Sequence, residues 1–104
     1  LATPEERPTS VIVLNLDDSL EGHYHRIAQE CRTHGLSAEV YPEKKKLGQQ
    51  FAYAEKKGIS FGIICGDREH RQGVVNLRYL ESRDSLDGVS LEKALEKMVS
   101  ALAG

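Results

Sequence analysis

The sequence predicts a small α/β domain, a three-layer sandwich whose mixed sheet of three parallel strands and an antiparallel extension is flanked by about three helices. Short apolar runs rich in β-branched residues alternate with segments of helical periodicity through the first two thirds of the chain. This order favours right-handed crossovers and a parallel sheet. A further strand then follows a turn too short for a crossover, so it is expected to run antiparallel to its neighbour.

The first strand and the first helix are predicted at the start of the chain. Residues 10–16 are almost entirely apolar, as in a central strand that is buried on both faces. Asp18, with Glu21 three residues later, fits a capping box that opens a helix. Gly35 is well placed as the residue that ends this helix.

The next three elements complete a β-α-β-α-β order. A short strand is predicted over residues 37–41, where Pro42 stops it. A helix is predicted over residues 47–57, with Gly58 at its end. Residues 59–65 form another apolar run, which predicts a second buried strand beside the first.

The following segment alternates in polarity. Residues 66–73 are interpreted as a polar turn, and residues 74–80 as a strand with Val75, Leu77 and Tyr79 on one face. The short connection predicts that this strand is antiparallel to the strand before it.

The last part of the chain is predicted to end in a helix. Residues 81–88 are interpreted as a loop or a weak edge strand, and Ser90 is placed to cap an amphipathic helix. The apolar positions of this helix are Leu91, Leu95, Met98 and Leu102. Residues 1–9 are interpreted as a linker or tail, and residues 10–104 as one domain with a modest core.

Charge is distributed unevenly along the chain. The net charge of −2 conceals −5 over residues 1–43, +5 over residues 44–80 and −2 over residues 81–104. A positive charge concentrated in the middle third favours a localised anionic partner over a polyanion that covers the whole surface. No apolar run approaches the roughly 20 residues of a membrane span.

Three consecutive lysines, Lys44, Lys45 and Lys46, lie between a strand end and a helix start. Ligands of open α/β sheets bind beyond the carboxyl ends of the strands, and free N–H groups at a helix start favour phosphate. The run is therefore a candidate anion site. A solvated loop is the alternative.

Enzyme and metal motifs are missing from the sequence. Cys31 and Cys65 lie in apolar patterns without metal spacing and are interpreted as buried free thiols. Asp17, Asp18 and Asp67 follow strands as the acidic residues of a phosphorylatable receiver domain do, but the chain lacks the further β-α-β unit that a receiver requires. We expect a binding module without a catalytic or metal site.

Glu69, Asn76 and Arg78 are the remaining polar candidates. Asn76 and Arg78 share one face of the predicted strand, where such a pair can bond a base edge or a phosphate. Routine polar residues on an exposed strand face are the alternative.

The segment from Lys46 to Leu80 contains a Lys-Leu start, a Gln, an aromatic residue and a Tyr-Ala pair, followed by a Gly-acid-x-Glu turn and a Gly-Val-Val strand. The residues in these positions are Lys46, Leu47, Gln50, Phe51, Tyr53, Ala54, Gly66, Asp67, Glu69, Gly73, Val74 and Val75. This pattern resembles the C-terminal anticodon-binding domain of class II aminoacyl-tRNA synthetases, and among these the histidyl-tRNA synthetases most closely. The resemblance extends over essentially the whole chain.

The resemblance implies a module that binds the anticodon loop of tRNA and holds no cofactor of its own. The parent enzyme would use ATP and Mg²⁺, act in the cytoplasm and form a homodimer. By the resemblance, base contacts fall to Lys44, Glu69 and Arg78. The other candidates for tRNA contact are Lys45, Lys46, Gln49 and Asn76. A synthetase-like regulator or accessory subunit that uses the domain to bind protein is the alternative function.

Overall fold

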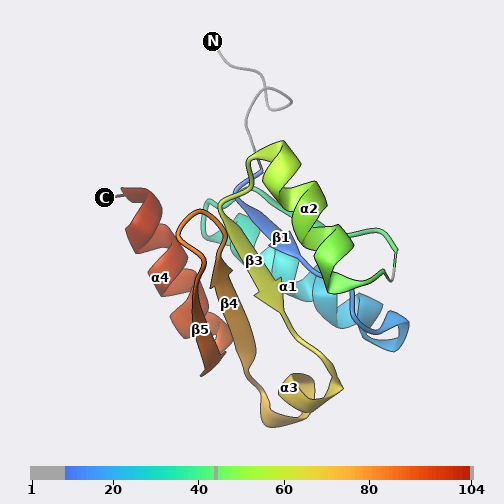
Figure 1. The fold of residues 1–104 in the computed structure, drawn as a ribbon. Coiled ribbons are helices and arrows are strands. Elements are labelled where there is room, and N and C mark those ends of the chain that lie inside the picture. Colours follow the sequence, from blue (N-terminus) through green and yellow to red (C-terminus); the bar gives the residue numbers. More distant parts are fainter. Residues whose placement is uncertain (1–8, 44, 104) are drawn as a thin grey trace.

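The computed structural model describes residues 9–43 and 45–103 of the chain (Figure 1). In chain order the elements are β1 (Val11–Val13), a 3₁₀ helix (Asp18–Leu20), α1 (Glu21–Thr33), β2 (Ala38–Val40), α2 (Leu47–Lys57), β3 (Phe61–Ile64), α3 (Asp67–Gln72), β4 (Val75–Tyr79), β5 (Asp84–Val89) and α4 (Leu91–Ala103). The predicted linker, residues 1–9, falls almost entirely outside the described residues, as does Lys44.

The five strands form one mixed sheet in the order β2-β1-β3-β4-β5. β1 pairs in parallel with both β2 and β3, whereas β4 is antiparallel to β3 and to β5. Helix α2 lies on one face of the sheet, and α1 and α4 lie on the other (Figure 1). The predicted three-layer α/β sandwich is thus confirmed.

Two apolar clusters hold the three layers together. On the α1 and α4 side, Val13, Ile63 and Leu77 are fully buried. On the α2 side, Ile12 and Leu14 of β1 form one cluster with the apolar face of α2. Because alternate residues of β1 enter opposite clusters, the strand must be apolar at every position, which explains its sequence.

One segment is more ordered than the sequence predicts. Residues 66–73, interpreted as a polar turn, contain the six-residue helix α3. There are consequently four α-helices among the described residues, where about three were predicted. The polar sequence concealed this helix, because most of its residues are exposed. For the segment interpreted as a loop or weak edge strand, the edge strand is correct, since β5 pairs with β4 at the edge of the sheet.

The predictions for the helix ends are mostly correct. Gly35 has a φ of +83° just after α1, and the Ser90 hydroxyl accepts a hydrogen bond from Lys93 N at 3.2 Å. The predicted cap at Asp18 is wrong, however. The carboxylate of Asp17 caps the 3₁₀ helix instead, because it accepts a hydrogen bond from Ser19 N. Leu102, assigned to the apolar face of the last helix, is 50% exposed.

Both cysteines are free and buried, as predicted. Burial raises the pKa of Cys31 and of Cys65 to about 11, so both thiols stay protonated and unreactive at neutral pH. No helix in the described ranges is both long and apolar enough to cross a membrane.

The sheet is covered unevenly on its two faces. On the α2 side, no helix of residues 9–43 and 45–103 lies over β4 and β5 (Figure 1). Arg78 of β4 is exposed on this part of the sheet, next to Phe51 of α2, so solvent reaches the sheet face there.

Replacing Leu77 by Ala should lower the free energy of unfolding by about 2–5 kcal/mol, because this fully buried side chain lies where the sheet meets α1 and α4. The same change at half-exposed Leu102 is the matched control and should cost less than about 1 kcal/mol. Urea unfolding followed by circular dichroism measures both. If both variants lost the same free energy of unfolding, Leu77 would not lie in the core between the sheet and its helices.

Candidate nucleic-acid interface

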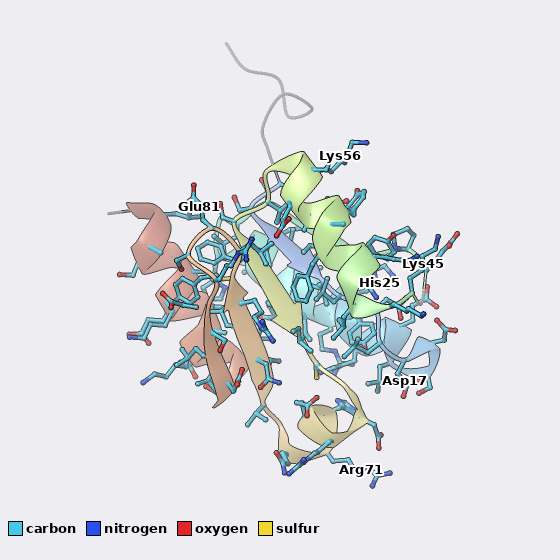
Figure 2. All side chains as sticks on the ribbon, in the orientation of Figure 1. Asp17, His25, Lys45, Lys56, Arg71 and Glu81 are labelled. Atoms are coloured by element: carbon cyan, nitrogen blue, oxygen red, sulfur yellow. The ribbon has the colours of Figure 1, made fainter. Side chains whose placement is uncertain are left out.

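The carboxyl ends of the parallel strands meet at one edge of the sheet, where β1 continues into Asn15, β2 into Tyr41 and β3 into Cys65. Figure 2 shows Lys45 and Asp17 on the α2 half of this region and Arg71 at its α3 end, whereas Lys56 lies at the opposite end of α2. Most of the predicted site residues lie along this edge or on the open sheet face next to it.

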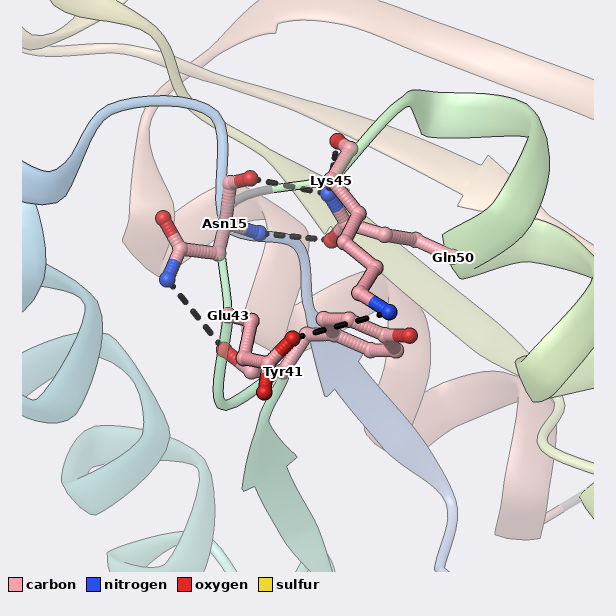
Figure 3. A network of polar contacts seen from close by, with 5 residues as sticks. All are labelled: Asn15, Tyr41, Glu43, Lys45 and Gln50. Carbon is pink, nitrogen blue, oxygen red and sulfur yellow. Dashed lines mark hydrogen bonds and ion pairs between the residues drawn. The ribbon is translucent and has the colours of Figure 1, made fainter.

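One buried side chain joins the end of β1 to the described lysines Lys45 and Lys46, which we call the lysine segment. Gln50 is fully buried, and its Oε1 accepts a hydrogen bond from Asn15 N at 2.7 Å (Figure 3). Its Nε2 donates to the carbonyl oxygens of Asn15 and Lys45, both at 2.8 Å. The Asn15 side chain, 4% exposed, donates in turn to Tyr41 O at 3.3 Å. We call this set of contacts the Gln50 clamp.

The Gln50 clamp replaces sheet pairing where the strands separate. Buried backbone groups without partners cost about 1–3 kcal/mol each, and the side-chain amide of Gln50 satisfies two of them on Asn15 and a part-buried one on Lys45. The same contacts fix the backbone of Lys45 relative to β1. Lys45 is thus held at the edge of the sheet, although its side chain and that of Lys46 are exposed.

The lysines occupy different positions around the start of α2. Lys46 is the N-cap residue in extended conformation, and its carbonyl accepts from Gln49 N at 3.0 Å and Gln50 N at 3.2 Å. Lys45 Nζ lies 3.5 Å from a carboxylate oxygen of Glu43, in an exposed ion pair. The first turn of α2 has no acidic residue, so no carboxylate of the helix itself lies beside Lys45 and Lys46 at its start. The prediction for Lys44 lies outside the described residues.

A second buried polar side chain secures the same edge from the other face. The hydroxyl of Tyr24 donates to Cys65 O at 2.7 Å and accepts from Leu16 N at 3.4 Å, which joins α1 to the ends of β1 and β3. Burial is the main reason that the pKa of Tyr24 is raised, so the hydroxyl remains a donor.

The side chain of Glu69 stabilises the start of its own helix, α3. Its Oε1 accepts from Gly66 N at 2.8 Å, which caps the helix, and a methyl group on Gly66 would lie only 3.0 Å from this oxygen. The Gly-acid-x-Glu spacing is therefore a capping motif in this chain. The rings of His70 and His23, 4.2 Å apart, connect α3 to α1. Burial, and secondarily the charges of His70 and Arg26, lower the pKa of His23.

Asn76 also has a structural contact. Its Oδ1 accepts from Gly88 N at 2.8 Å, at the register shift between β4 and β5. Gly88 has a φ of +66°, a conformation that glycine adopts without strain, and its N–H is one that a bulge removes from regular pairing. The side-chain oxygen of Asn76 is thus already engaged.

Arg78 is the predicted site residue that the open sheet face presents most fully. It is exposed, lies opposite Gly62 of β3 and Ser85 of β5, and its guanidinium carbon is 5.6 Å from the centre of the Phe51 ring. This cation–π contact holds the guanidinium beside α2. Gln49 is exposed on α2, and its side chain has no hydrogen bond to another described residue.

Sequence reasoning did not assign roles to Gln50, Asn15, Tyr24 or Phe51. Gln50 carried a signal, since a polar residue stands among the apolar positions Leu47, Phe51 and Ala54 of the α2 face. The contacts of Asn15 and Tyr24 connect residues far apart in sequence, and no local pattern indicates them.

The receiver alternative finds no support in the geometry. Asp17 caps the 3₁₀ helix, and Asp67 forms an ion pair with Arg71 at 3.1 Å. No group of three or more His, Cys, Asp or Glu side chains in the described part of the chain could hold a metal ion. The last two strands are antiparallel, unlike those of a receiver sheet.

Replacing Gln50 by Leu should lower the free energy of unfolding by about 2–4 kcal/mol, because the buried N–H and C=O of Asn15 and the part-buried C=O of Lys45 would lose their partner. Gln49 to Leu, one residue earlier on the exposed side of α2, is the matched control and should change stability by about 0.5 kcal/mol or less. Urea denaturation compares the two. A Gln50 variant as stable as its control would show that the clamp is dispensable.

Comparison with known proteins agrees with this geometry. The family described as "Anticodon binding domain" matches residues 10–101. The histidine–tRNA ligase of Rhodopirellula baltica is 33% identical over 96 residues, covering 92% of this chain and 22% of the relative. The ligase of Wolinella succinogenes is 36% identical over 94 residues, covering 88% and 21%. The chain therefore spans about a fifth of the length of these relatives.

Solved structures give the same result. The crystal structure of histidyl-tRNA synthetase from Nostoc sp. PCC 7120 superposes with a TM-score of 0.88 at 33% identity, over 98% of this chain and 24% of that one. The RNA binding domain of threonyl-tRNA synthetase from Cryptosporidium parvum, at 16% identity and a TM-score of 0.81, shares the fold, over 89% of this chain and 23% of that one. The resemblance expected from residues 46–80 is confirmed, and the chain belongs to the anticodon binding domain family.

Proposed function

We propose that this chain binds the anticodon loop of a tRNA, as the anticodon-binding module of a histidyl-type aminoacyl-tRNA synthetase. The observation that carries the proposal is the Gln50 clamp, which holds a lysine segment beside an open sheet face that presents Arg78. Single-stranded RNA requires cations for its phosphates and planar groups for its unstacked bases. The relatives named above are histidine–tRNA ligases, which supports histidine as the amino acid.

We assign the candidate residues to different kinds of contact. Lys45 and Lys46 are proposed to bind phosphates, together with the start of α2, and Lys44 is proposed to join them. Arg78 is proposed to contact a base, because it is exposed and a cation–π contact with Phe51 already positions its guanidinium. Gln49 is proposed as a polar contact from the exposed side of α2.

Glu69 and Asn76 are proposed to contribute to RNA binding mainly by shaping the surface. Each already accepts a hydrogen bond within the domain, Glu69 from Gly66 N and Asn76 from Gly88 N. A second oxygen of the Glu69 carboxylate can still accept a bond from a base.

The reaction of the whole protein is part of the same proposal. Attachment of histidine to tRNA, with ATP and Mg²⁺ as cofactors, would be carried out by residues outside this chain. We propose further that the whole protein forms a homodimer and acts in the cytoplasm.

Replacing Lys45 and Lys46 together by Ala should weaken binding to the anticodon stem-loop of a histidine tRNA by about three- to tenfold at low salt. The slope of log K against log salt should also fall by about 1–1.5, because roughly two phosphate contacts are lost. Fluorescence anisotropy of a labelled stem-loop, titrated at several salt concentrations, measures both quantities.

The matched control replaces Lys93 and Lys97, two exposed lysines of α4 on the opposite face, by Ala. It removes the same charge and should leave affinity within about twofold. If the two double variants bound equally well, the lysine segment would have no special role in RNA binding.

A further inference from the structure

A cavity lies between the end of α1 and the start of α4. It has a volume of about 310 Å³ and is lined by Glu30, His34, Leu91, Glu92 and Leu95. Helices α1 and α4 cover the face of the sheet opposite to α2 (Figure 1). This cavity, which we call the α1–α4 pocket, and the candidate RNA contacts of α2 therefore lie on different faces of the domain.

The floor of the α1–α4 pocket is apolar and continues along α4. Leu95 is buried in the core, and Leu91 packs against the same cluster. Val99 and Leu102 follow Leu95 at spacings of four and three residues, which places them on the same side of the helix. They are 38% and 50% exposed, and no other large apolar side chain in the described part of the chain is exposed. This line of apolar residues is about 16 Å long, or about three helical turns.

The rims of the α1–α4 pocket are acidic. Glu30 of α1 and Glu92 of α4 are exposed, and neither carboxylate forms an ion pair with another residue of the ranges 9–43 and 45–103. Arg32, in the last turn of α1, is engaged elsewhere, since its Nη2 donates to Ala38 O at 2.9 Å. Both carboxylates are therefore free to pair with a cation from outside the domain.

The charge of the α1–α4 pocket differs from that of a pocket beside α2. There, the carboxylates of Glu55 and Glu81 share the lining with Arg83. The described residues that line the α1–α4 pocket include no lysine or arginine. His34 lines it, and its Nδ1 lies 2.9 Å from Glu30 O at the end of α1. The carbonyl end of a helix carries partial negative charge, which adds to the attraction for a cation.

Local stabilisation explains one of the two rim carboxylates. Glu92 lies in the first turn of α4, where a negative charge stabilises the helix. Glu30 lies in the last turn of α1, where the helix dipole disfavours a negative charge. An unpaired carboxylate at this end of a helix, beside an apolar floor, favours a cationic ligand that also carries apolar groups.

We propose that the α1–α4 pocket and the apolar line of α4 bind a basic amphipathic segment of a partner protein. An arginine of the segment would lay its aliphatic stem across the leucines of the floor, while its guanidinium pairs with Glu30 and Glu92. Apolar residues of the segment would cover Val99 and Leu102. A nucleic acid is disfavoured here, because its phosphates would meet unpaired carboxylates. This interaction goes beyond the proposed RNA binding and uses the opposite face of the domain.

A designed peptide tests the chemistry of the partner. The probe is a fluorescein-labelled peptide of about 14 residues, with leucines at every third or fourth position, arginines on both flanks of the leucine face and alanines elsewhere. Measured by fluorescence anisotropy at low salt, the 104-residue chain should bind it about tenfold or more tightly than matched peptides with Gln for Arg or Ser for Leu. No binding of the arginine peptide, or equal binding of the three peptides, would overturn the proposal.

A double variant of the chain tests the rim carboxylates. Glu30→Gln combined with Glu92→Gln should weaken binding of the arginine peptide about three- to tenfold, because two charge pairs are lost. Glu55→Gln combined with Glu81→Gln is the matched control. It removes the same charge from exposed positions outside the α1–α4 pocket and should leave the affinity within about twofold. Equal losses would mean that the peptide senses only overall charge, which would overturn the site.

Amide chemical shifts locate the bound peptide. In nitrogen–proton correlation spectra of the chain, the largest shifts on titration should fall at the end of α1 and along α4. Largest shifts at the lysine segment or in the β4–β5 hairpin would overturn the site.

A second copy of the chain is the competing occupant of the apolar line. Analytical ultracentrifugation of the free chain, at the concentrations of the titration, should give a monomer. A dimer that Leu102→Ser dissociates would show that copies of the chain cover α4, which would overturn the proposal.

The two proposals can fail separately. The double variant of Glu30 and Glu92 should bind the anticodon stem-loop within about twofold of the wild type, because its changes lie on the face opposite to α2. If the arginine peptide fails to bind while the stem-loop binds, the peptide site falls and the proposed function stands. If the peptide binds as expected while the stem-loop does not, the proposed function falls and the peptide site stands.

Discussion

The candidate interface depends on how a parallel sheet ends. Where β1 and β2 separate, the backbone of Asn15 leaves the sheet while still buried, and its N–H and C=O need partners. Gln50 supplies both and also bonds to Lys45 O, so one side chain closes the core and fixes the adjacent lysine segment. An apolar side chain at position 50 would fill the same space but would leave these three polar groups unpaired. This explains why an amide stands on the otherwise apolar face of α2.

The same use of polar groups recurs around the interface. Tyr24 joins the ends of β1 and β3, Glu69 caps α3, and Asn76 bonds the bulged strand β5. Each of these side chains holds a segment in place, whereas the groups left free to meet a ligand, such as the guanidinium of Arg78, are exposed beside them. The surface thus combines rigid backbone with exposed cationic side chains, an arrangement suited to a flexible single-stranded partner.

The sequence predicted those features that local patterns encode. Buried strands, the bounds of α2 and the Ser90 cap follow from apolar runs, periodicity and capping residues within a few positions of one another. The helix α3 was missed, and the edge strand β5 was predicted only as one of two alternatives, because the residues of both are mostly exposed and carry little periodicity. The Gln50 clamp spans 35 positions and the Tyr24 bond 41, and contacts at such separations arise only from the folded topology.

A double-mutant cycle between the clamp and the lysines tests most directly whether Gln50 presents the lysine segment to RNA. Stem-loop affinity is measured for the wild type, for Gln50→Leu, for the double change of Lys45 and Lys46 to Ala, and for all three together, at a temperature where every variant is folded. The account predicts that loss of the lysines weakens binding much less when Gln50 is already replaced, since the segment no longer holds its position. Additive losses would contradict it, because the lysines would then act independently of the clamp.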